Sequence, residues 1–246
     1  MQPFDDARLR SVMVDDQIAG RGVGSHEVLE ADSKRRNTMP DPISISIGPH
    51  QLEGELVLAK PPRGIVVFAH GSGSSRRSRR NIQVARALQS RGLGTLLFDL
   101  LTPEEAEIRA HVFDIDLLSQ RLLQALDALP PIRQPIGLFG ASTGAAAALV
   151  AAARRPEEVQ AVVSRGGRPD LAIEHLGAVR APTLLIVGGA DTEVLALNQA
   201  ALRLMRCEKR LEVVPRATHL FEEAGALETV AALAGPWFLE HFRPAV

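Results

Sequence analysis

The sequence has 246 residues, of which 46% are hydrophobic and 23% charged, and its formal net charge is −1. These values are typical of one large α/β domain, or of such a domain with a small appendage. The balanced charge gives no electrostatic basis for a nucleic acid or an anionic membrane as a partner. The single cysteine, Cys207, excludes an intrachain disulfide and a multi-cysteine zinc site.

The beginning of the chain predicts a cytoplasmic protein. Its first residues, MQPFDDARLR, are acidic where a signal peptide has a basic flank and an apolar run. The sequence also lacks the roughly 18 consecutive apolar residues of a membrane-spanning helix. Residues 1–40 are charged, contain two predicted short helices at 5–19 and 25–33, and end in the linker-like SKRRNTMPDP. We therefore predict a helical N-terminal appendage and linker at 1–42 and a main domain at 43–246.

The main domain begins with a predicted β-hairpin at 43–48 and 52–59, where polar and apolar residues alternate. Compact apolar runs then alternate with helical patterns, which predicts strands buried on both faces. The predicted strands are 64–70, 95–100, 136–140, 161–164, 183–189 and 211–214. The predicted helices are 80–92, 112–129, 143–154, 193–206 and 224–242. This alternation predicts a mostly parallel eight-stranded α/β sheet with helices on both faces.

One serine lies where a predicted strand turns into a predicted helix. Ser142 is the central residue of Gly140-Ala-Ser-Thr-Gly144, the G-x-S-x-G pattern in which a strained turn presents a nucleophile. The small flanking residues leave room for the neighbouring backbone at such a turn. A serine at the start of a helix can also simply cap it. The pattern alone leaves both interpretations open.

A serine nucleophile needs a general base and an acid that orients the base. Of the seven histidines, only His219 lies on the loop between the last predicted strand and the last predicted helix. Asp191 follows the predicted strand 183–189, between the serine and the histidine in the chain. Taken singly, Asp191 could cap a helix and His219 could be a surface loop residue. Three suitable residue types at strand ends, in the order Ser, Asp, His, favour a catalytic triad.

The loop after the predicted strand 64–70 is rich in glycine and serine. Glycines allow backbone N–H groups to approach a ligand closely, so this loop is a candidate half of an oxyanion hole. The N–H of Thr143 is the other predicted donor, and Ser72, followed by Gly73, is the predicted donor from the loop. His70 lies on the strand side of this loop, which favours a structural role over that of a catalytic base.

The stretch from about 43 to 243 resembles the α/β-hydrolase superfamily and, within it, the dienelactone-hydrolase-related serine hydrolases. The motifs that carry the resemblance are FAHGSGSS, GLFGASTGAAAALVAAA, LLIVGGADTEVLALN and VPRATHLFEE. The resemblance implies an α/β-hydrolase fold and Ser142, Asp191 and His219 as the triad. Dienelactone hydrolases in the strict sense use a cysteine nucleophile, whereas this chain has a serine at that position.

Residues 7–31 resemble the leading helices of protein-L-isoaspartate methyltransferases. The glycine-rich strand and loop that bind S-adenosylmethionine in that family do not follow these residues. The resemblance therefore implies no methyltransferase activity, and we interpret the segment as a helical appendage.

Two arginines after the predicted strand 161–164 are candidate pocket residues. Arg165 or Arg168 could reach a carboxylate on the substrate, although a solvated polar loop explains them equally well. The run SRRSRR at 75–80 could attract an acidic substrate, but such runs are more often solvated and paired with acids. The interval between residues 164 and 183 is short for a lid insertion, which predicts a fold without a lid domain and an open cleft for small or flexible esters.

These observations predict a serine hydrolase that cleaves carboxylic esters and needs no metal or organic cofactor. Its predicted partner is a small-molecule ester, with neither nucleic acid nor membrane as a partner, and a homo-oligomer stays open. An acyltransferase with the same triad is one alternative, because water and another acceptor can attack the same intermediate. A non-catalytic binding protein with the hydrolase fold is the other. Nucleotide binding through Gly71 and Gly73 is disfavoured because no lysine or G-x-G-x-x-G pattern accompanies them.

Overall fold

The computed structural model describes residues 41–59, 63–131 and 134–243, all within the unit 39–246. The helices predicted at 5–19 and 25–33, and the resemblance of residues 7–31, lie outside the described residues. The strands are β1 (Ile43–Ile47), β2 (Leu52–Val57), β3 (Ile65–Ala69), β4 (Gly94–Phe98), β5 (Ile136–Ala141), β6 (Val159–Arg165), β7 (Thr183–Gly188) and β8 (Lys209–Val214).

The α-helices are α2 (Arg79–Gln89), α3 (Pro103–Ala106), α4 (Arg109–Val112), α5 (Ile115–Asp127), α6 (Thr143–Arg154), α7 (Thr192–Leu204) and α8 (Ala226–His241). Two short 3-10 helices, η1 (Pro169–Ala172) and η2 (Leu176–Ala178), follow β6. Among the described residues, no helix is both long enough and apolar enough to span a membrane.

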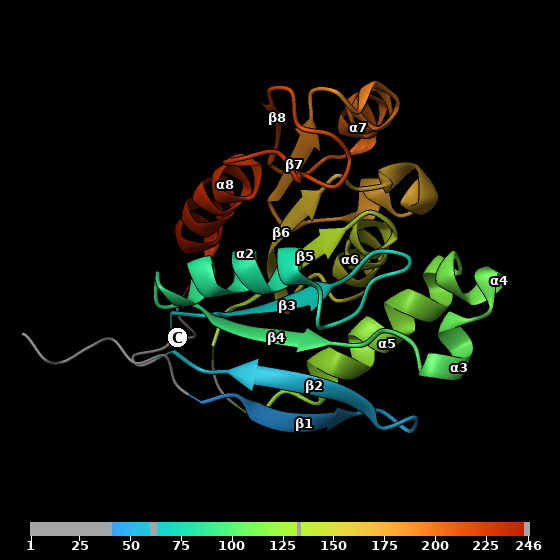
Figure 1. The fold of residues 1–246 in the computed structure, drawn as a ribbon, viewed down its shortest axis with the longest axis vertical. Helices are drawn as coiled ribbons and strands as arrows, with labels where there is room; N and C mark the ends of the chain where they lie inside the picture. Colours follow the sequence, from blue (N-terminus) through green and yellow to red (C-terminus); the bar gives the residue numbers. More distant parts are fainter. Residues whose placement is uncertain (1–40, 60–62, 132–133, 244–246) are drawn as a thin grey trace, which may run out of the picture. The chain divides into compact units, whose positions relative to one another are not determined.

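The eight strands form one sheet in the order β1-β2-β4-β3-β5-β6-β7-β8 (Figure 1). The pairs β1–β2 and β2–β4 are antiparallel, and the other pairs are parallel. The mostly parallel eight-stranded sheet predicted from the sequence is confirmed. The chain runs from β3 to β4 on one side and then crosses to β5 on the other side of β3. Open α/β sheets bind ligands at such a reversal, outside the carboxyl ends of the strands.

Strand register brings the segments that follow β3, β5 and β6 to the same edge of the sheet. Ala69 at the end of β3 pairs with Gly140 of β5, and Ala141 pairs with Arg165 at the end of β6. The loop that starts at His70 therefore begins beside the turn at Ser142.

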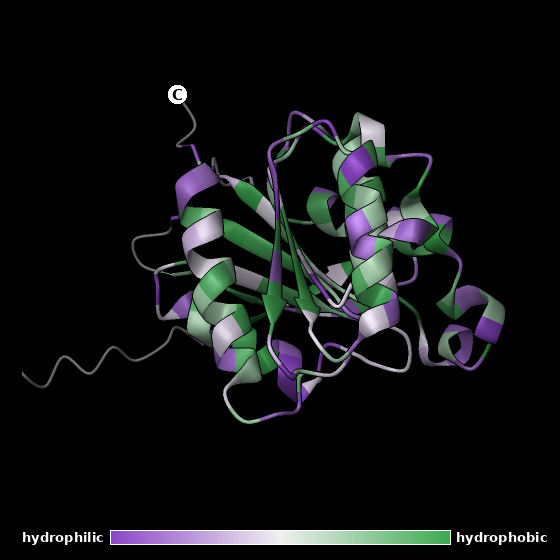
Figure 2. Ribbon diagram, turned by 90° about the horizontal axis from the view of Figure 1, so that it is seen from above, coloured by the Kyte–Doolittle hydropathy of each residue, from purple (hydrophilic) through white to green (hydrophobic). Residues whose placement is uncertain are grey.

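Helices cover both faces of the sheet, as predicted. Figure 2 shows the mostly hydrophobic strands between the helices. One buried cluster joins the sheet to α2 and α8, and the other joins it to α5, α6 and α7. Helix α6 is buried from Thr143 to Ala152. Its alanines explain this burial, because their small side chains let the helix approach the sheet and α5 closely.

The five predicted helices all form: α6 has the predicted bounds, and the other four have shifted ends. The helix predicted from 112 begins at Ile115, because the Asp114 side chain accepts a hydrogen bond from the Leu117 N–H at 2.9 Å and caps it. Helices α3 and α4 were not predicted. Each has four residues, too few for a helical hydrophobic pattern to appear in the sequence.

Candidate active site

The turn between β5 and α6 holds Ser142 in an unusual backbone conformation, with φ 52° and ψ −120°. A positive φ is rare for a residue with a side chain and is found where the surroundings impose it. The two glycines of the motif make room for this turn. A Cβ on Gly140 would lie 2.3 Å from the Cα of Ala145, and one on Gly144 would lie 2.2 Å from the carbonyl oxygen of Ala69.

The side chain of Ser142 does not cap the helix that follows it. It makes no capping hydrogen bond, and its Oγ lies 3.3 Å from Nε2 of His219. The structure therefore does not support the interpretation of Ser142 as a simple helix cap.

His219 joins this serine to Asp191. Its Nδ1 lies 2.7 Å from Oδ2 of Asp191, whose carboxylate makes no capping bond to α7 although Asp191 directly precedes that helix. A carboxylate can only accept, so Nδ1 carries the proton and Nε2 of the neutral ring is free to accept from the serine hydroxyl. The structure thus brings together the three residues that sequence order suggested.

Backbone contacts hold the His219 loop against the end of β7. The Ala190 N–H donates to the carbonyl of Ala217 at 3.0 Å. A Cβ on Gly188 would lie only 2.3 Å from that same carbonyl oxygen. A larger residue at 188 would push the loop away, so this glycine sets the approach of His219 to Asp191.

The three predicted oxyanion-hole residues line one cavity beside Ser142. Thr143 is the first residue of α6 and is buried, so its N–H is at the positive end of the helix dipole. Ser72 and Gly73 border the same cavity from the loop after β3. Gly73 has φ +66°, a conformation that favours glycine. The structure therefore places the three residues around one space, and their role as donors stays a prediction.

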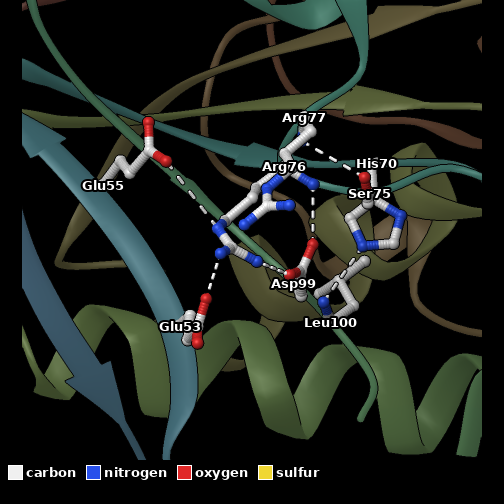
Figure 3. A network of polar contacts seen from close by, with 8 residues as sticks. All are labelled: Glu53, Glu55, His70, Ser75, Arg76, Arg77, Asp99 and Leu100. Atoms are coloured by element: carbon white, nitrogen blue, oxygen red, sulfur yellow. Dashed lines mark hydrogen bonds and ion pairs between the residues drawn. The ribbon is translucent and has the colours of Figure 1, made fainter. Parts of the chain in front are cut away.

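Polar contacts of His70 and of Arg76 fasten this loop at its two ends (Figure 3). At one end, the buried His70 accepts from the Leu100 N–H through Nε2 at 3.0 Å, and its Nδ1 lies 3.0 Å from the Gly71 carbonyl oxygen. At the other end, Arg76 donates to Asp99 through its backbone N–H, at 2.7 Å, and through its guanidinium. We call residues 70–76 the oxyanion loop.

The Arg76 guanidinium also binds Glu53 and lies 3.8 Å from Glu55 on β2. One arginine of the SRRSRR run is thus nearly enclosed by three carboxylates. Burial lowers the pKa of the other fastening residue, His70, although the bond to Gly71 and the charge of Asp99 oppose that effect. Because Nε2 accepts from an N–H, the His70 ring is neutral and carries its proton on Nδ1. This geometry agrees with the structural role predicted for His70.

The two candidate pocket arginines lie outside the lining of this cavity. Arg168 makes a two-pronged ion pair with Asp170, at 2.9 and 2.7 Å, which raises its pKa. Arg165 is buried over the ring of Phe221 and reaches Oδ1 of Asn81 at 3.4 Å. Burial, with a smaller effect of Arg80, lowers its pKa to about 10. Contact of either arginine with a substrate carboxylate stays a prediction.

The cavity beside Ser142 has a volume of about 330 Å³. The oxyanion loop forms one wall, and the segment from Asp99 through α3 and α4 forms the other. Between β6 and β7 the described residues form only the short helices η1 and η2, and the short segment after β4 encloses part of the cleft. Among the described residues, no group of three or more His, Cys, Asp or Glu side chains is arranged to hold a metal ion.

Sequence reasoning missed two residues that support the site. Arg76 was seen only as one member of an arginine run, because its partners lie far away along the chain. Asn198 is fully buried in α7 and donates through Nδ2 to the carbonyl of Gly167 at 3.0 Å. That bond steadies the loop whose Arg168 N–H donates to the Ser142 carbonyl. A lone asparagine in an amphipathic helix gave no signal of this contact.

Comparison with known proteins shows the family to which the chain belongs. Residues 64–220 match the family described as alpha/beta hydrolase fold. The chain belongs to the α/β-hydrolase family. It is also similar to the crystal structure of a dienelactone hydrolase from Anabaena variabilis, with 56% identity and a TM-score of 0.78. That match covers 83% of this chain and 100% of the other, so this α/β hydrolase is related to the dienelactone hydrolases.

One further solved structure shares only the fold with this chain, and two mycobacterial proteins share a large part of its sequence. The protein Est1E from Butyrivibrio proteoclasticus shares the fold at a TM-score of 0.68 and 15% identity, over 80% of this chain and 98% of Est1E. Proteins from two Mycobacterium tuberculosis strains, CDC 1551 and H37Rv, are 58% identical over 203 residues and are provisionally named phosphoribosyl transferases. The match covers 81% of this chain and 46% of each mycobacterial protein. The chain therefore spans about half the length of these relatives.

Proposed function

We propose that this α/β hydrolase cleaves carboxylic esters of small or flexible molecules through an acyl-enzyme at Ser142. The observation that carries the proposal is the series of contacts from Asp191 through His219 to the Ser142 hydroxyl, at 2.7 and 3.3 Å. The strained backbone of Ser142 supports the same function, because strain of this kind is found at sites where a side chain must be presented.

The reaction proceeds in two halves. Ser142 Oγ attacks the ester carbonyl carbon while His219 Nε2 takes the hydroxyl proton, and the carbonyl electron pair moves onto oxygen. The tetrahedral intermediate then expels the alcohol, which receives the proton from His219, and leaves an acyl group on Ser142. Water attacks this acyl group in the same way, which releases the acid and regenerates the serine. Asp191 keeps the ring in the required tautomer and stabilises the imidazolium.

The negative oxygen of the intermediate needs donors in place before the reaction. We assign this role to the N–H groups of Thr143 and Ser72, with Gly73 as the neighbouring candidate. Loss of one such donor costs about 3–4 kcal/mol of transition-state stabilisation in a serine protease. The fastening of the oxyanion loop at His70 and Arg76 supports the assignment, because donors are effective only when they are held in place.

The two alternatives differ from the proposal in the fate of the serine. An acyltransferase forms the same acyl-enzyme but passes the acyl group to an acceptor other than water. A non-catalytic binding protein forms no acyl-enzyme. The provisional name of the mycobacterial relatives refers to proteins more than half of which lies outside the match. Our proposal therefore rests on the residues of this chain.

Fluorophosphonate labelling of the full chain tests the nucleophile. We expect wild type to be labelled and Ser142→Ala to remain unlabelled and inactive on 4-nitrophenyl butanoate. We expect Asp191→Asn to lower kcat by about 10⁴-fold, because the imidazole then takes the wrong tautomer. Labelling that persists in Ser142→Ala would refute the assignment.

Product analysis separates the alternatives. With added alcohol acceptors, a hydrolase still forms mainly the free acid, whereas an acyltransferase forms mainly the new ester. Wild type that binds fluorophosphonate at no residue and turns over no ester would instead indicate the non-catalytic binding protein.

A further inference from the structure

The cavity beside Ser142 has one side that is distinctly apolar. Leu100 and Leu101 follow β4, Val112 belongs to α4, and Leu118 belongs to α5, and all four line the cavity. Leu100, Leu101 and Leu118 are buried. A charged group placed against these side chains would lose its hydration without gaining a partner from them.

Charges at the cavity also oppose an anion. None of the described residues that line it is a lysine or an arginine, whereas the carboxylates of Asp99 and Glu107 border it. The nearby Arg76 is already bound to Asp99 and Glu53 and lies close to Glu55. Away from the Thr143 N–H at the start of α6, an anionic group in the cavity would therefore meet carboxylates and, among the described residues, no lysine or arginine side chain.

His70 does not supply the missing positive charge. Its Nε2 accepts a hydrogen bond from the Leu100 N–H, an interaction that a protonated ring nitrogen could not make. Burial acts in the same direction and disfavours the charged ring. The imidazole thus faces the cavity as a neutral group.

The site geometry indicates which half of an ester occupies this space. The leaving alcohol must receive its proton from His219, so it lies on the His219 side of the carbonyl. Neither Ser142 nor His219 lines the cavity, so the reacting carbon lies at its mouth, whereas Thr143, which directly follows the serine, lines it together with Ser72 and Gly73. A carbonyl oxygen held by those three residues directs the acyl group into the cavity and the alcohol out of it.

We propose that this cavity binds the acyl group of the substrate, that it accepts neutral apolar acyl groups, and that it rejects acyl groups that carry a carboxylate. The inference rests on the proposed ester hydrolysis at Ser142. The volume of about 330 Å³ is near the lower end for ligand pockets and fits an aromatic or short branched acyl group. The substrate class is therefore neutral esters of small aromatic or branched acids.

Three 4-nitrophenyl benzoates of similar shape test this inference on the full chain. Their para substituents are isopropyl, carboxamide and carboxylate, so the series separates charge from polarity. We expect kcat/KM to fall in that order and to be about 100-fold lower for the carboxylate than for the isopropyl ester. The rigid ring keeps the carboxylate away from the ester, so it cannot assist its own hydrolysis.

Reversing a charge at the edge of the cavity provides a second test of the inference. Glu107→Lys places a cation at the exposed edge of the cavity, and we expect it to raise kcat/KM about 10-fold for the carboxylate ester relative to the isopropyl ester. Glu104→Lys is the matched control. Glu104 is exposed in the same short segment, in α3, and does not line the cavity, so its variant should keep the wild-type ratio.

The outcomes distinguish this inference from the proposed function. If the carboxylate ester is hydrolysed as well as the isopropyl ester or better, the cavity assignment is wrong and an anion-binding role of Arg165 is favoured. Equal ratios in Glu107→Lys and Glu104→Lys would also overturn it. If no ester is hydrolysed and fluorophosphonate labels nothing, both the proposed function and this inference fail.

Discussion

At the scale of single residues, the candidate site depends on a few positions where only one kind of side chain fits. Ser142 keeps a positive φ because its neighbours hold it on both sides. Its N–H donates to the Arg165 carbonyl at 3.3 Å, and its own carbonyl accepts from the Arg168 and Ala145 N–H groups. Such a conformation costs on the order of 1–3 kcal/mol, which these bonds and the surrounding packing must offset.

Gly144 gives a prediction that runs against helix propensity. In an exposed helix, Gly→Ala adds about 1 kcal/mol of stability. A Cβ at 144 would instead lie 2.2 and 2.4 Å from the carbonyl oxygens of Ala69 and His70. Backbone cannot move aside as a flexible side chain does, so we expect Gly144→Ala to lower the free energy of unfolding by about 3 kcal/mol. Urea denaturation with a two-state fit measures this change.

Gly177→Ala is the matched control for this prediction. Gly177 lies in η2, where a Cβ would have only the Leu204 carbonyl oxygen nearby, at 3.8 Å. Its variant should be as stable as wild type or slightly more stable. Equal stability of Gly144→Ala and Gly177→Ala would show that the turn tolerates a methyl group and is not sterically constrained.

At the scale of elements, the sequence predicted those strands and helices that have a clear local pattern of apolar residues. Each buried strand was visible as an apolar run, and α6 was visible as an alanine-rich apolar stretch after Ser142. Helix α3 was not predicted, although Thr102 and Glu105 form a capping box that is readable in TPEE. The four arginines of SRRSRR gave no indication of which one would be enclosed, because Arg76 meets carboxylates from β2 and from the end of β4.

The ion pairs of Arg76 with Asp99 and Glu53 lead to a prediction about the position of the oxyanion loop. Without its guanidinium, the end of the loop loses its contacts with Asp99 and Glu53 and keeps only the backbone bond. We expect Arg76→Ala to lower kcat on 4-nitrophenyl butanoate by about 10- to 100-fold, with little change in KM. This loss is smaller than the loss expected when one oxyanion-hole donor is removed, because the donor is displaced and not deleted. Arg76→Lys should restore only part of kcat, because one ammonium cannot reproduce the fork of contacts.

Arg155→Ala is the control that shows what the loss of ion pairs away from the site does to kcat. Arg155 also binds two carboxylates, Asp127 and Glu158, but at the opposite end of α6 from Ser142. Arg155→Ala should leave kcat unchanged. If both alanine variants lower the melting temperature and neither lowers kcat, Arg76 stabilises the fold without positioning the oxyanion loop.

At the scale of the whole molecule, the sheet brings distant parts of the chain to one edge. Ser142, Asp191 and His219 follow three different strands, and their order along the chain was enough to predict that they meet. The segment 98–105 leaves a strand at its carboxyl end, where open α/β sheets bind ligands, so its place near the site could be expected, and Asp99 to Pro103 do line the cavity. The contribution of α4 was not predictable, because Val112 reaches the cavity only through the pairing of β4 with β3. The same pairing places the buried His70 against Leu100, which links this site to the stability of the whole fold.

Global stability should therefore depend on pH through His70. Its pKa in the folded protein lies below the ordinary 6.5, mainly because of burial. The unfolded chain then binds more protons than the folded chain as the pH falls through 6.5, so the free energy of unfolding must decrease with falling pH. The contribution of His70 is fully present above pH 6.5, and its loss below that pH approaches 1.4 kcal/mol per pH unit at most.

Urea denaturation at several pH values between 8 and 5 measures this slope in wild type, His70→Gln and His50→Gln. The glutamine at 70 can still accept from the Leu100 N–H but does not titrate, so its variant should be less stable at pH 8 and show a flatter slope below pH 6.5. His50 is exposed in the turn between β1 and β2, and His50→Gln should follow the wild-type profile. If the free energy of unfolding depends on pH with the same slope in wild type and in His70→Gln, groups other than His70 cause the acid sensitivity. Removal of the buried imidazole would then leave the difference in bound protons between the unfolded and folded chain unchanged.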